Sequence, residues 1–252
     1  TLMPETISIS IGRRKLPTHR EFITSSGKLA LVERSILHDL FDGDRGNGVA
    51  LQGDRVRGTG WSYVIGGWTD EMGRDDFQQR ANPASGSLEQ DAFLLALGSR
   101  VSFGNSKPGR FDQVDVSGGA LRWDVGTSLM HSVANQAASA PGRTRGAIDA
   151  WLGVEHFSFV SGVHVARQQG SGARLDGFGA QQTVSYAWRG GLIPAARGAV
   201  FLPSGDTPHQ HELTIGFNIL SPRRAHGLKL ALDASTLSDG QRRARAMVQV
   251  AL

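Results

Sequence analysis

The stretch His211-Glu212-Leu213-Thr214-Ile215-Gly216-Phe217-Asn218-Ile219 places an apolar residue at every second position. Near the start of the chain, Thr6-Ile7-Ser8-Ile9-Ser10-Ile11-Gly12 follows the same pattern. A period of two predicts a β-strand with one apolar and one polar face. The alternation recurs along the chain, so we predict an all-β, antiparallel fold. A soluble sandwich and a membrane barrel both contain such strands, and they differ in which face touches the apolar medium.

The composition favours a single domain with a polar interior. The chain has 252 residues, of which 39% are hydrophobic, and it contains 33 glycines and no cysteine. One all-β barrel of this length is common, whereas a soluble two-layer protein would normally be nearer half apolar. A barrel with a polar lumen needs apolar residues only on its outer face. The absence of cysteine excludes disulfides, thiolate metal sites and cysteine nucleophiles.

The charge balance is basic, with a formal net charge of +4 and a pI near 9.9, and arginine outnumbers lysine. The planar guanidinium group makes bidentate hydrogen bonds to phosphate and carboxylate, although a solvated basic surface is the alternative interpretation. No apolar run approaches the roughly 20 residues of a membrane-spanning helix. The chain begins at Thr1 rather than at methionine, so we expect a processed chain or part of a longer one.

The alternation and the turn residues predict about twelve strands. Arg57-Gly58-Thr59-Gly60 and Gly190-Gly191 have the composition of short turns, while the connections 69–87 and 127–146 are long and polar. Short turns that alternate with long loops are typical of an outer-membrane barrel, whose ends face different compartments. The expected strands lie near 5–13, 46–54, 60–68, 88–104, 111–126, 145–155, 157–168, 175–188, 191–203, 209–219, 225–236 and 242–251.

Aromatic residues gather near the ends of the expected strands. Trp61, Tyr63 and Trp68 flank one strand, and Tyr186 and Trp188 close another. Amphipathic rings at these places fit the aromatic belts of a membrane protein, where the ring sits at the level of the lipid headgroups. The alternative is that the rings fill a soluble core.

Charged residues share the face opposite the apolar one. Arg122 and Asp124 alternate with apolar neighbours in one expected strand, and Lys229 and Asp233 do so in another. Arg243 and Arg245 lie on one face of the last strand. Both signs of charge occur on this face, so a lumen lined by it would be a mixed polar channel with a basic excess.

The segment 28–41 breaks the period of two. Its apolar residues recur at three- and four-residue spacing, which predicts a short helix with Thr24, Ser25 and Ser26 as candidates for the N-cap. The apolar stripe would contain Leu29, Val32, Ile36, Leu40 and Phe41. A long helical insertion between two barrel strands is a candidate for a loop that folds into the lumen and narrows it.

Five stretches around this segment resemble the phosphate-selective porins O and P. The family shows a strand that ends in Gly-x-x-Lys-x-Pro, then Thr-Ser-Ser, then Glu-Arg-Ser, and then Arg-x-x-Gly leading into a strand and a hairpin that bears a tyrosine. The resemblance is specific over residues 5–68 and weaker beyond. The matching stretches are Gly12-Arg13-Arg14-Lys15-Leu16-Pro17, Glu21-Phe22-Ile23-Thr24-Ser25-Ser26, Val32-Glu33-Arg34-Ser35, Arg45-Gly46-Asn47-Gly48-Val49-Ala50-Leu51-Gln52-Gly53 and Gly60-Trp61-Ser62-Tyr63.

The resemblance implies an antiparallel transmembrane β-barrel in the outer membrane of a Gram-negative bacterium. Members of the family are trimers of sixteen-stranded barrels that pass anions through a lumen lined with Arg and Lys and narrowed by an inward-folded loop. Strands precede the Gly-x-x-Lys-x-Pro strand in family members, whereas about a dozen residues precede it here. We therefore expect residues 1–252 to form a single barrel domain, which either lacks N-terminal strands or belongs to a smaller relative of the family.

We expect a water-filled channel for small anions such as phosphate or polyphosphate, with no catalysed chemistry, no metal and no cofactor. Ser25 and Ser26 would donate hydrogen bonds to a passing oxyanion, and Arg34 and Arg45 would lie near the constriction. The residues expected to line the pathway along the strands are Arg100, Arg122, Lys229, Arg243 and Arg245.

The expected partners are membrane lipid or lipopolysaccharide, small inorganic anions, and either two further copies in a homotrimer or a larger envelope assembly. We expect no nucleic-acid partner, because the chain has no recognisable stacking platform or recognition module. Two alternatives stay open. One is a non-conducting structural barrel within a larger envelope complex, and the other is a soluble secreted β-sandwich adhesin or sugar-binding protein.

Overall fold

The computed structural model describes residues 7–25, 28–41, 45–53, 60–71, 93–105, 113–114, 119–133, 142–169, 176–188, 191–204, 208–220 and 228–250. These residues form one twelve-stranded sheet, in which each strand pairs with the strands next to it in sequence. Every pairing is antiparallel, as in a continuous meander. The predicted all-β, antiparallel fold class is confirmed.

The strands are β1 (Ile7–Lys15), β2 (Arg45–Gly53), β3 (Trp61–Glu71), β4 (Phe93–Gly104), β5 (Arg122–Ser132), β6 (Gly142–Val154), β7 (Phe157–Gln169), β8 (Gly177–Tyr186), β9 (Leu192–Pro203), β10 (Gln210–Leu220), β11 (Leu228–Leu237) and β12 (Arg242–Val250). Two short helices, α1 (Arg20–Ile23) and α2 (Ile36–Phe41), lie between β1 and β2. In the described residues β1 pairs only with β2 and β12 only with β11, so the sheet is open between these two edges.

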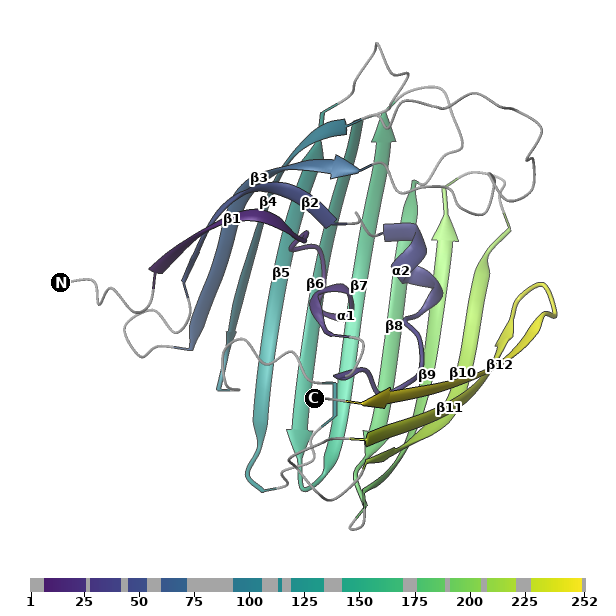
Figure 1. Cartoon of the computed structure of the whole chain (residues 1–252). Helices are drawn as coiled ribbons and strands as arrows, with labels where there is room; N and C mark the ends of the chain where they lie inside the picture. The colour runs from purple at the N-terminus through teal and green to yellow at the C-terminus, as the bar shows by residue number, and fades with distance from the viewer. Residues whose placement is uncertain are drawn as a thin grey trace.

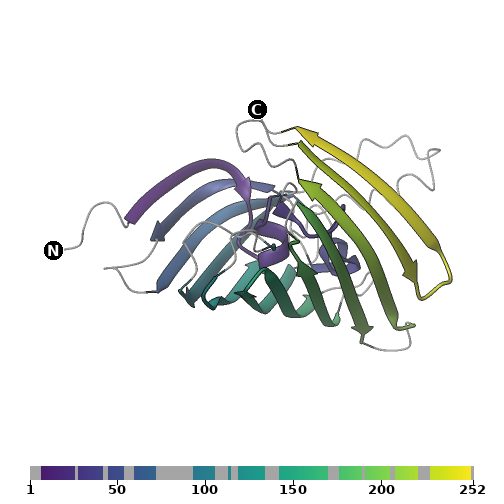
Figure 2. The ribbon, with the colours of Figure 1, turned by 90° about the horizontal axis from the view of Figure 1, so that it is seen from below.

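The sheet is strongly curved, and the chain between β1 and β2 lies on its concave side (Figures 1 and 2). We call residues 16–41 the inner segment; α1 and α2 belong to it. The inner segment leaves the sheet at the end where the odd-numbered strands finish, and we call this end the loop end.

At the opposite end, β6 and β7 are joined by Glu155 and His156, both with positive φ (46° and 76°). Positive φ at both central residues is the backbone of the two-residue turns that suit twisted hairpins.

Eleven of the expected strands coincide closely with β1–β4 and β6–β12, but the fifth was placed too early. β5 runs over Arg122–Ser132, whereas the sequence suggested 111–126 followed by a long loop over 127–146. Thr127 and Leu129 face outward, and Ser128 and Met130 face inward, so the alternation continues through this stretch. Polar residues made the stretch resemble a loop, but they are satisfied on the concave face: the Ser128 hydroxyl donates to the Thr18 carbonyl of the inner segment. The expected loop 69–87 lies mostly outside the described residues.

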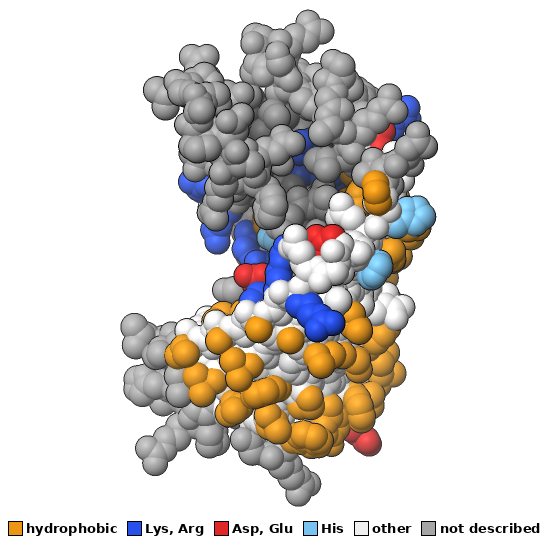
Figure 3. Space-filling model, turned by 90° about the vertical axis from the view of Figure 1, so that its right-hand side faces the viewer, with side chains coloured by type: hydrophobic (Ala, Val, Ile, Leu, Met, Phe, Trp, Pro, Cys, Tyr) orange, Lys and Arg blue, Asp and Glu red, His pale blue; other side chains and the backbone are white. Residues whose placement is uncertain are grey.

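The two faces of the sheet have opposite character. The convex face carries exposed apolar side chains on strand after strand, for example Ile148 and Ile215, each 60% exposed, and Leu129, 57% exposed. The concave face carries buried charges such as Arg100 and Asp149, which are 4% and 3% exposed. Apolar side chains cover the lower part of the surface seen in Figure 3. This arrangement is the reverse of a soluble sandwich, whose apolar faces meet inside.

Outward-facing rings lie together at the end of the sheet opposite the loop end, and we call it the ring end. Trp61, Phe103 and Trp123 form one row across β3, β4 and β5, with ring centroids 4.7 and 5.3 Å apart. Phe157 and Tyr186 form a second contact across β7 and β8, at 4.5 Å.

Trp68 does not belong to this group, contrary to the sequence-based expectation. It is buried on the concave face, because it occupies an inward position of β3. There it packs against Leu16 and Phe22 of the inner segment.

The helix expected over 28–41 is only six residues long. α2 begins at Ile36, and Leu29 to Ser35 run as bends rather than as helix. The reason is that the backbone groups of these residues bond to side chains of distant strands instead of to one another, as the next subsection shows. Thr24 ends α1 and does not begin α2. Within the described residues, no helix is long and apolar enough to cross a membrane.

Candidate functional site

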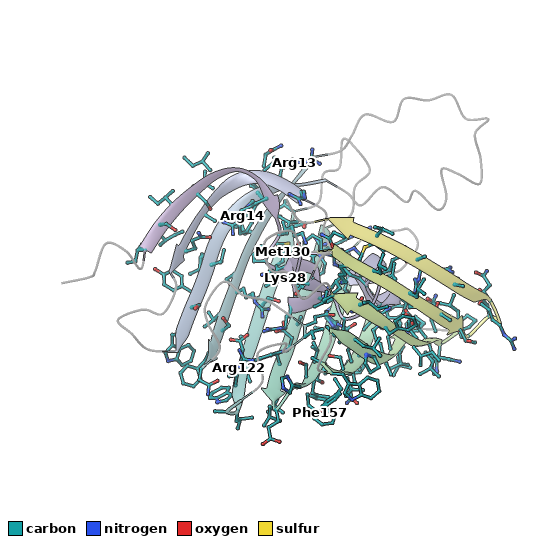
Figure 4. All side chains as sticks on the ribbon, turned by 60° about the horizontal axis from the view of Figure 1, so that its bottom comes forward. Arg13, Arg14, Lys28, Arg122, Met130 and Phe157 are labelled. Atoms are coloured by element: carbon teal, nitrogen blue, oxygen red, sulfur yellow. The ribbon has the colours of Figure 1, made fainter. Side chains whose placement is uncertain are left out.

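The inner segment packs on the sheet through three apolar clusters. Leu16 and Phe22 contact Trp68, Ala96 and Met130; Figure 4 places Met130 on the concave side. The other two clusters join α2 and the bends before it to β9: Leu37 and Phe41 meet Ala199 and Phe201, and Ala30 and Leu31 meet Ala195. The side chains of this segment therefore form the apolar core of a sheet whose own inner face is largely polar.

A buried ion-pair cluster holds α1 against β4, β5 and β6. The Arg20 guanidinium lies 2.6 Å from the Asp124 carboxylate. Arg100 donates to both oxygens of Asp149 at 2.7 Å, and one of those oxygens also accepts the backbone N–H of Arg20 at 3.0 Å. Arg20 and Arg100 thus pair with the carboxylates of Asp124 and Asp149, so each buried charge has a partner of opposite sign. The Arg100 guanidinium binds Asp149 in bidentate geometry.

A second cluster holds Glu21 and the residues before α2. Arg197 of β9 lies 3.3 Å from Glu21 and 2.5 Å from Glu212 of β10. The Ser35 hydroxyl donates to Glu21 at 2.7 Å. The Ile36 N–H donates to Glu212 at 2.7 Å. Glu21 and the residues before α2 are therefore fixed to β9 and β10 through Arg197 and Glu212.

The bends between Leu29 and Glu33 are bound through their backbone. Lys229 donates to the Leu29 carbonyl at 2.8 Å, and Asn218 donates to the Ala30 carbonyl at 2.7 Å. Asp233 accepts the Val32 N–H at 2.9 Å. These strand side chains take the backbone bonds that a helix would otherwise make internally, which explains why the predicted helix is interrupted.

A hollow of about 440 Å³ opens between the inner segment and the first two strands. Among the described residues, its lining holds three cations and no carboxylate; the cations are Lys15, Arg34 and Arg45. Ser25, His38, Phe22 and Ile23 also line the hollow. The Lys15 ammonium donates to the Phe22 and Thr24 carbonyls at 2.7 and 2.9 Å. Arg34 donates to the Glu21 and Thr24 carbonyls at 2.9 and 2.7 Å. Backbone carbonyls thus hold two of the cations in place.

His38 does not add to this charge at neutral pH. Burial lowers its pKa to about 3, and the positive field of Arg34 contributes in the same direction. The hollow therefore offers guanidinium and ammonium groups and the Ser25 hydroxyl, all of which suit an oxyanion. Within the described residues, no group of three His, Cys, Asp or Glu is placed to hold a metal ion.

The structure brings together three of the predicted site residues and disperses the rest. Ser25, Arg34 and Arg45 line one hollow. Ser26 lies outside the described residues. Arg122 is half-buried and lies over the Trp151 ring at 5.7 Å, near the ring end of β5 (Figure 4).

Several strand cations expected to line an anion pathway are bonded to other parts of the chain. Arg100 is paired with Asp149, and Lys229 is bonded to the inner segment. Arg245 bridges Asp233 and Glu33 at 2.7 and 2.6 Å. Arg243 shares the concave face with Arg245 but is exposed near the β11–β12 turn. The carboxylates paired with Arg100 and Arg245 come from other strands and from the inner segment, so a single-strand pattern could not reveal the pairs.

Sequence reasoning missed Lys15 and His38 as parts of the hollow. Lys15 was visible as the lysine of the Gly-x-x-Lys-x-Pro stretch, at the end of the first strand. His38 gave no signal, because only the fold of α2 brings it to the hollow. No family model matches the chain, and a search of curated proteins finds no match.

Proposed function

We propose that this chain forms a β-barrel in the outer membrane of a Gram-negative bacterium and passes small anions, in the manner of the phosphate-selective porins O and P that its sequence resembles. The observation that carries the proposal is the inverted polarity of the sheet, apolar and exposed on the convex face, charged and buried on the concave face. Lipid requires an apolar exterior, and a solvated lumen tolerates charge.

Membrane insertion requires that the open edges of the sheet be covered. An unpaired strand edge exposes N–H and C=O groups, each of which costs several kcal/mol in hydrocarbon. We propose that β1 and β12 are paired in the membrane, so that the curved sheet closes into a barrel, and that the barrels associate as homotrimers. The rings at the ring end support this placement, because they lie where an aromatic belt would contact headgroups.

Anion preference follows from the hollow. Lys15, Arg34 and Arg45 present positive charge, Ser25 adds a hydroxyl donor, and the part of the lining that the structure describes contains no carboxylate. Such a site lowers the electrostatic barrier for an oxyanion such as phosphate and raises it for a cation. The inner segment sets the width of the passage, since it occupies the concave side of the sheet (Figure 2).

Conductance across planar lipid bilayers tests this function. Wild-type protein is expected to form channels whose reversal potential in a salt gradient favours anions. Arg45→Gln should lower the anion-to-cation permeability ratio about fivefold, since one unit charge a few ångströms from the passing ion is worth about 1 kcal/mol in water. Arg167→Gln, on an outward position of β7, is the matched control. Channels that favour cations would contradict the proposal.

A second candidate function is a non-conducting structural barrel within a larger envelope complex. The inner segment is fixed to strands across the sheet by buried ion pairs, hydrogen bonds to its backbone and apolar clusters. A segment held this firmly on the concave side favours a barrel that does not conduct. Membrane-inserted protein that gives no conductance but copurifies with envelope proteins would select this function.

A further inference from the structure

The charged side chains on the outward face are distributed unevenly between the two ends of the sheet. Among the strand residues whose exposure is described, the charged ones at outward, exposed positions away from the hollow are three arginines near the loop end, namely Arg13, Arg167 and Arg242. His131 and His211 occupy outward positions at the same end. At the ring end, outward positions carry aromatic side chains such as Phe157 and Tyr186. Figure 4 shows Arg13 and Phe157 at opposite ends of the sheet.

Part of this basic group forms a continuous row across neighbouring strands. The His131 imidazole lies 3.0 Å from the Thr144 hydroxyl, and Thr144 is opposite Arg167 in the register of β6 and β7. Arg13 lies in β1 and Arg242 at the start of β12, at the two edges of the sheet. We call Arg13, His131, Arg167, His211 and Arg242 the basic rim. Of the acidic residues at this end, Asp176 and Asp239 lie in connections, and Asp70 and Glu71 are the last two residues of β3.

The basic rim continues directly from the apolar face. Val165 and Val163, 51% and 39% exposed, precede Arg167 at outward positions of β7, and Leu213 follows His211 on β10. Figure 3 shows histidine side chains, and side chains of the Lys and Arg class, bordering the apolar surface. A phospholipid-like molecule would contact both parts of this surface, with its phosphate on the basic rim and its acyl chains on the apolar face. Free phosphate would contact only the basic rim.

We infer that the basic rim binds the phosphate groups of an anionic membrane lipid whose acyl chains lie on the adjoining apolar face. This inference rests on the proposed function. It orients the barrel, because the loop end then lies at the leaflet that holds the phosphorylated lipid and the ring end at the opposite leaflet. Guanidinium groups suit this role, since they pair with phosphate in bidentate geometry and each basic residue near an anionic membrane surface strengthens binding about fivefold.

Native mass spectrometry of the folded full chain in a nonionic detergent tests the inference, with lipid A as the phosphorylated lipid and phosphatidylcholine as the neutral one. Wild-type protein is expected to retain lipid A in preference to phosphatidylcholine, and added salt should release it. Arg242→Gln should weaken binding of lipid A about fivefold. Arg243→Gln is the matched control, because the neighbouring side chain faces the concave side, and its affinity should equal that of the wild type.

The combined variant Arg13→Gln, Arg167→Gln, Arg242→Gln should weaken binding by a factor on the order of a hundred. Equal affinities of the Arg242 and Arg243 variants, or equal retention of dephosphorylated lipid A, would overturn the inference. Displacement by an equal concentration of inorganic phosphate would also overturn it and assign the rim to free phosphate. If the inference alone is wrong, the wild type still inserts into bilayers; a wild type that stays soluble without detergent contradicts the proposed function as well.

Discussion

The guanidinium of Arg20 and the carboxylate of Asp124 form an ion pair of 2.6 Å between segments separated by about a hundred residues of chain. Arg20 belongs to the inner segment and Asp124 to β5, so the pair joins the contents of the concave side to its wall. Asp149 accepts a hydrogen bond from the backbone of the same arginine. The position of the inner segment, and hence the shape of the hollow, depends on these buried charges.

Removing one anion from this cluster is expected to destabilise the protein strongly. Asp149→Asn leaves the buried Arg100 without its charged partner, which typically costs about 3–5 kcal/mol. The free energy of unfolding in urea measures the loss. Asp239→Asn is the control, because Asp239 is exposed in the β11–β12 turn, and it should change stability by less than about 0.5 kcal/mol. Equal effects of the two substitutions would show that the cluster does not hold the inner segment.

Gly179 leaves room for α2, and a side chain there should displace the helix. A Cβ atom on Gly179 would lie 2.7 Å from the Phe41 ring and 2.8 Å from Leu37. Gly179→Ala is therefore expected to destabilise the docked helix by about 1–3 kcal/mol. Limited proteolysis of the inner segment reports the release. A Cβ atom on Gly198 meets nothing within 4 Å, so Gly198→Ala should leave the cleavage rate unchanged.

Acid is expected to loosen the inner segment through His19. Burial lowers the pKa of His19 to about 4; Glu21 and Asp149 act against this shift, while Arg100 and Arg34 reinforce it. Since the folded protein binds the proton less tightly than the unfolded chain, the stabilisation is complete above about pH 6.5 and declines as the pH falls toward 4. The difference amounts to about 3 kcal/mol.

Thermal unfolding between pH 7.5 and pH 5 measures this dependence. The midpoint of the wild type should fall with pH, and His19→Asn should fall less steeply, because asparagine does not titrate. Carboxylates that titrate in the same range affect both proteins alike. Parallel curves for the two proteins would contradict the role given to His19.

A charge at the middle of the convex face should prevent membrane insertion. Leu129 is 57% exposed at an outward position of β5, and arginine on the lipid face near the bilayer midplane costs about 2–4 kcal/mol. Leu129→Arg should reduce the fraction of protein that refolds into vesicles, measured by protection from protease. Thr127→Ser, two residues away on the same face, should insert like the wild type. A soluble sandwich would tolerate Leu129→Arg without any vesicle-dependent effect.

The strands could be predicted because their information is local. Alternation of the kind seen from Leu213 to Ile219 assigns each residue to a face, and the register of β10 with β9 and β11 follows that assignment. The prediction was wrong where polar residues on the inner face resembled a loop, as at Ser128 in β5. The hollow was predicted in part, since Ser25, Arg34 and Arg45 stand in the stretches that resemble a family, whereas His38 does not.

The sequence by itself determined that the fold is all-β, that each strand has one apolar and one polar face, and that the segment between the first two strands differs from the rest. Only the tertiary structure decided which polar residues of the strands are bound to distant parts of the chain. Arg100, Lys229 and Arg245 stand in sequence like any other cation of an alternating strand, but strand pairing and the inner segment give them partners inside the sheet. The physical reason is that periodicity reports a residue's face, while its electrostatic partner comes from a distant part of the chain.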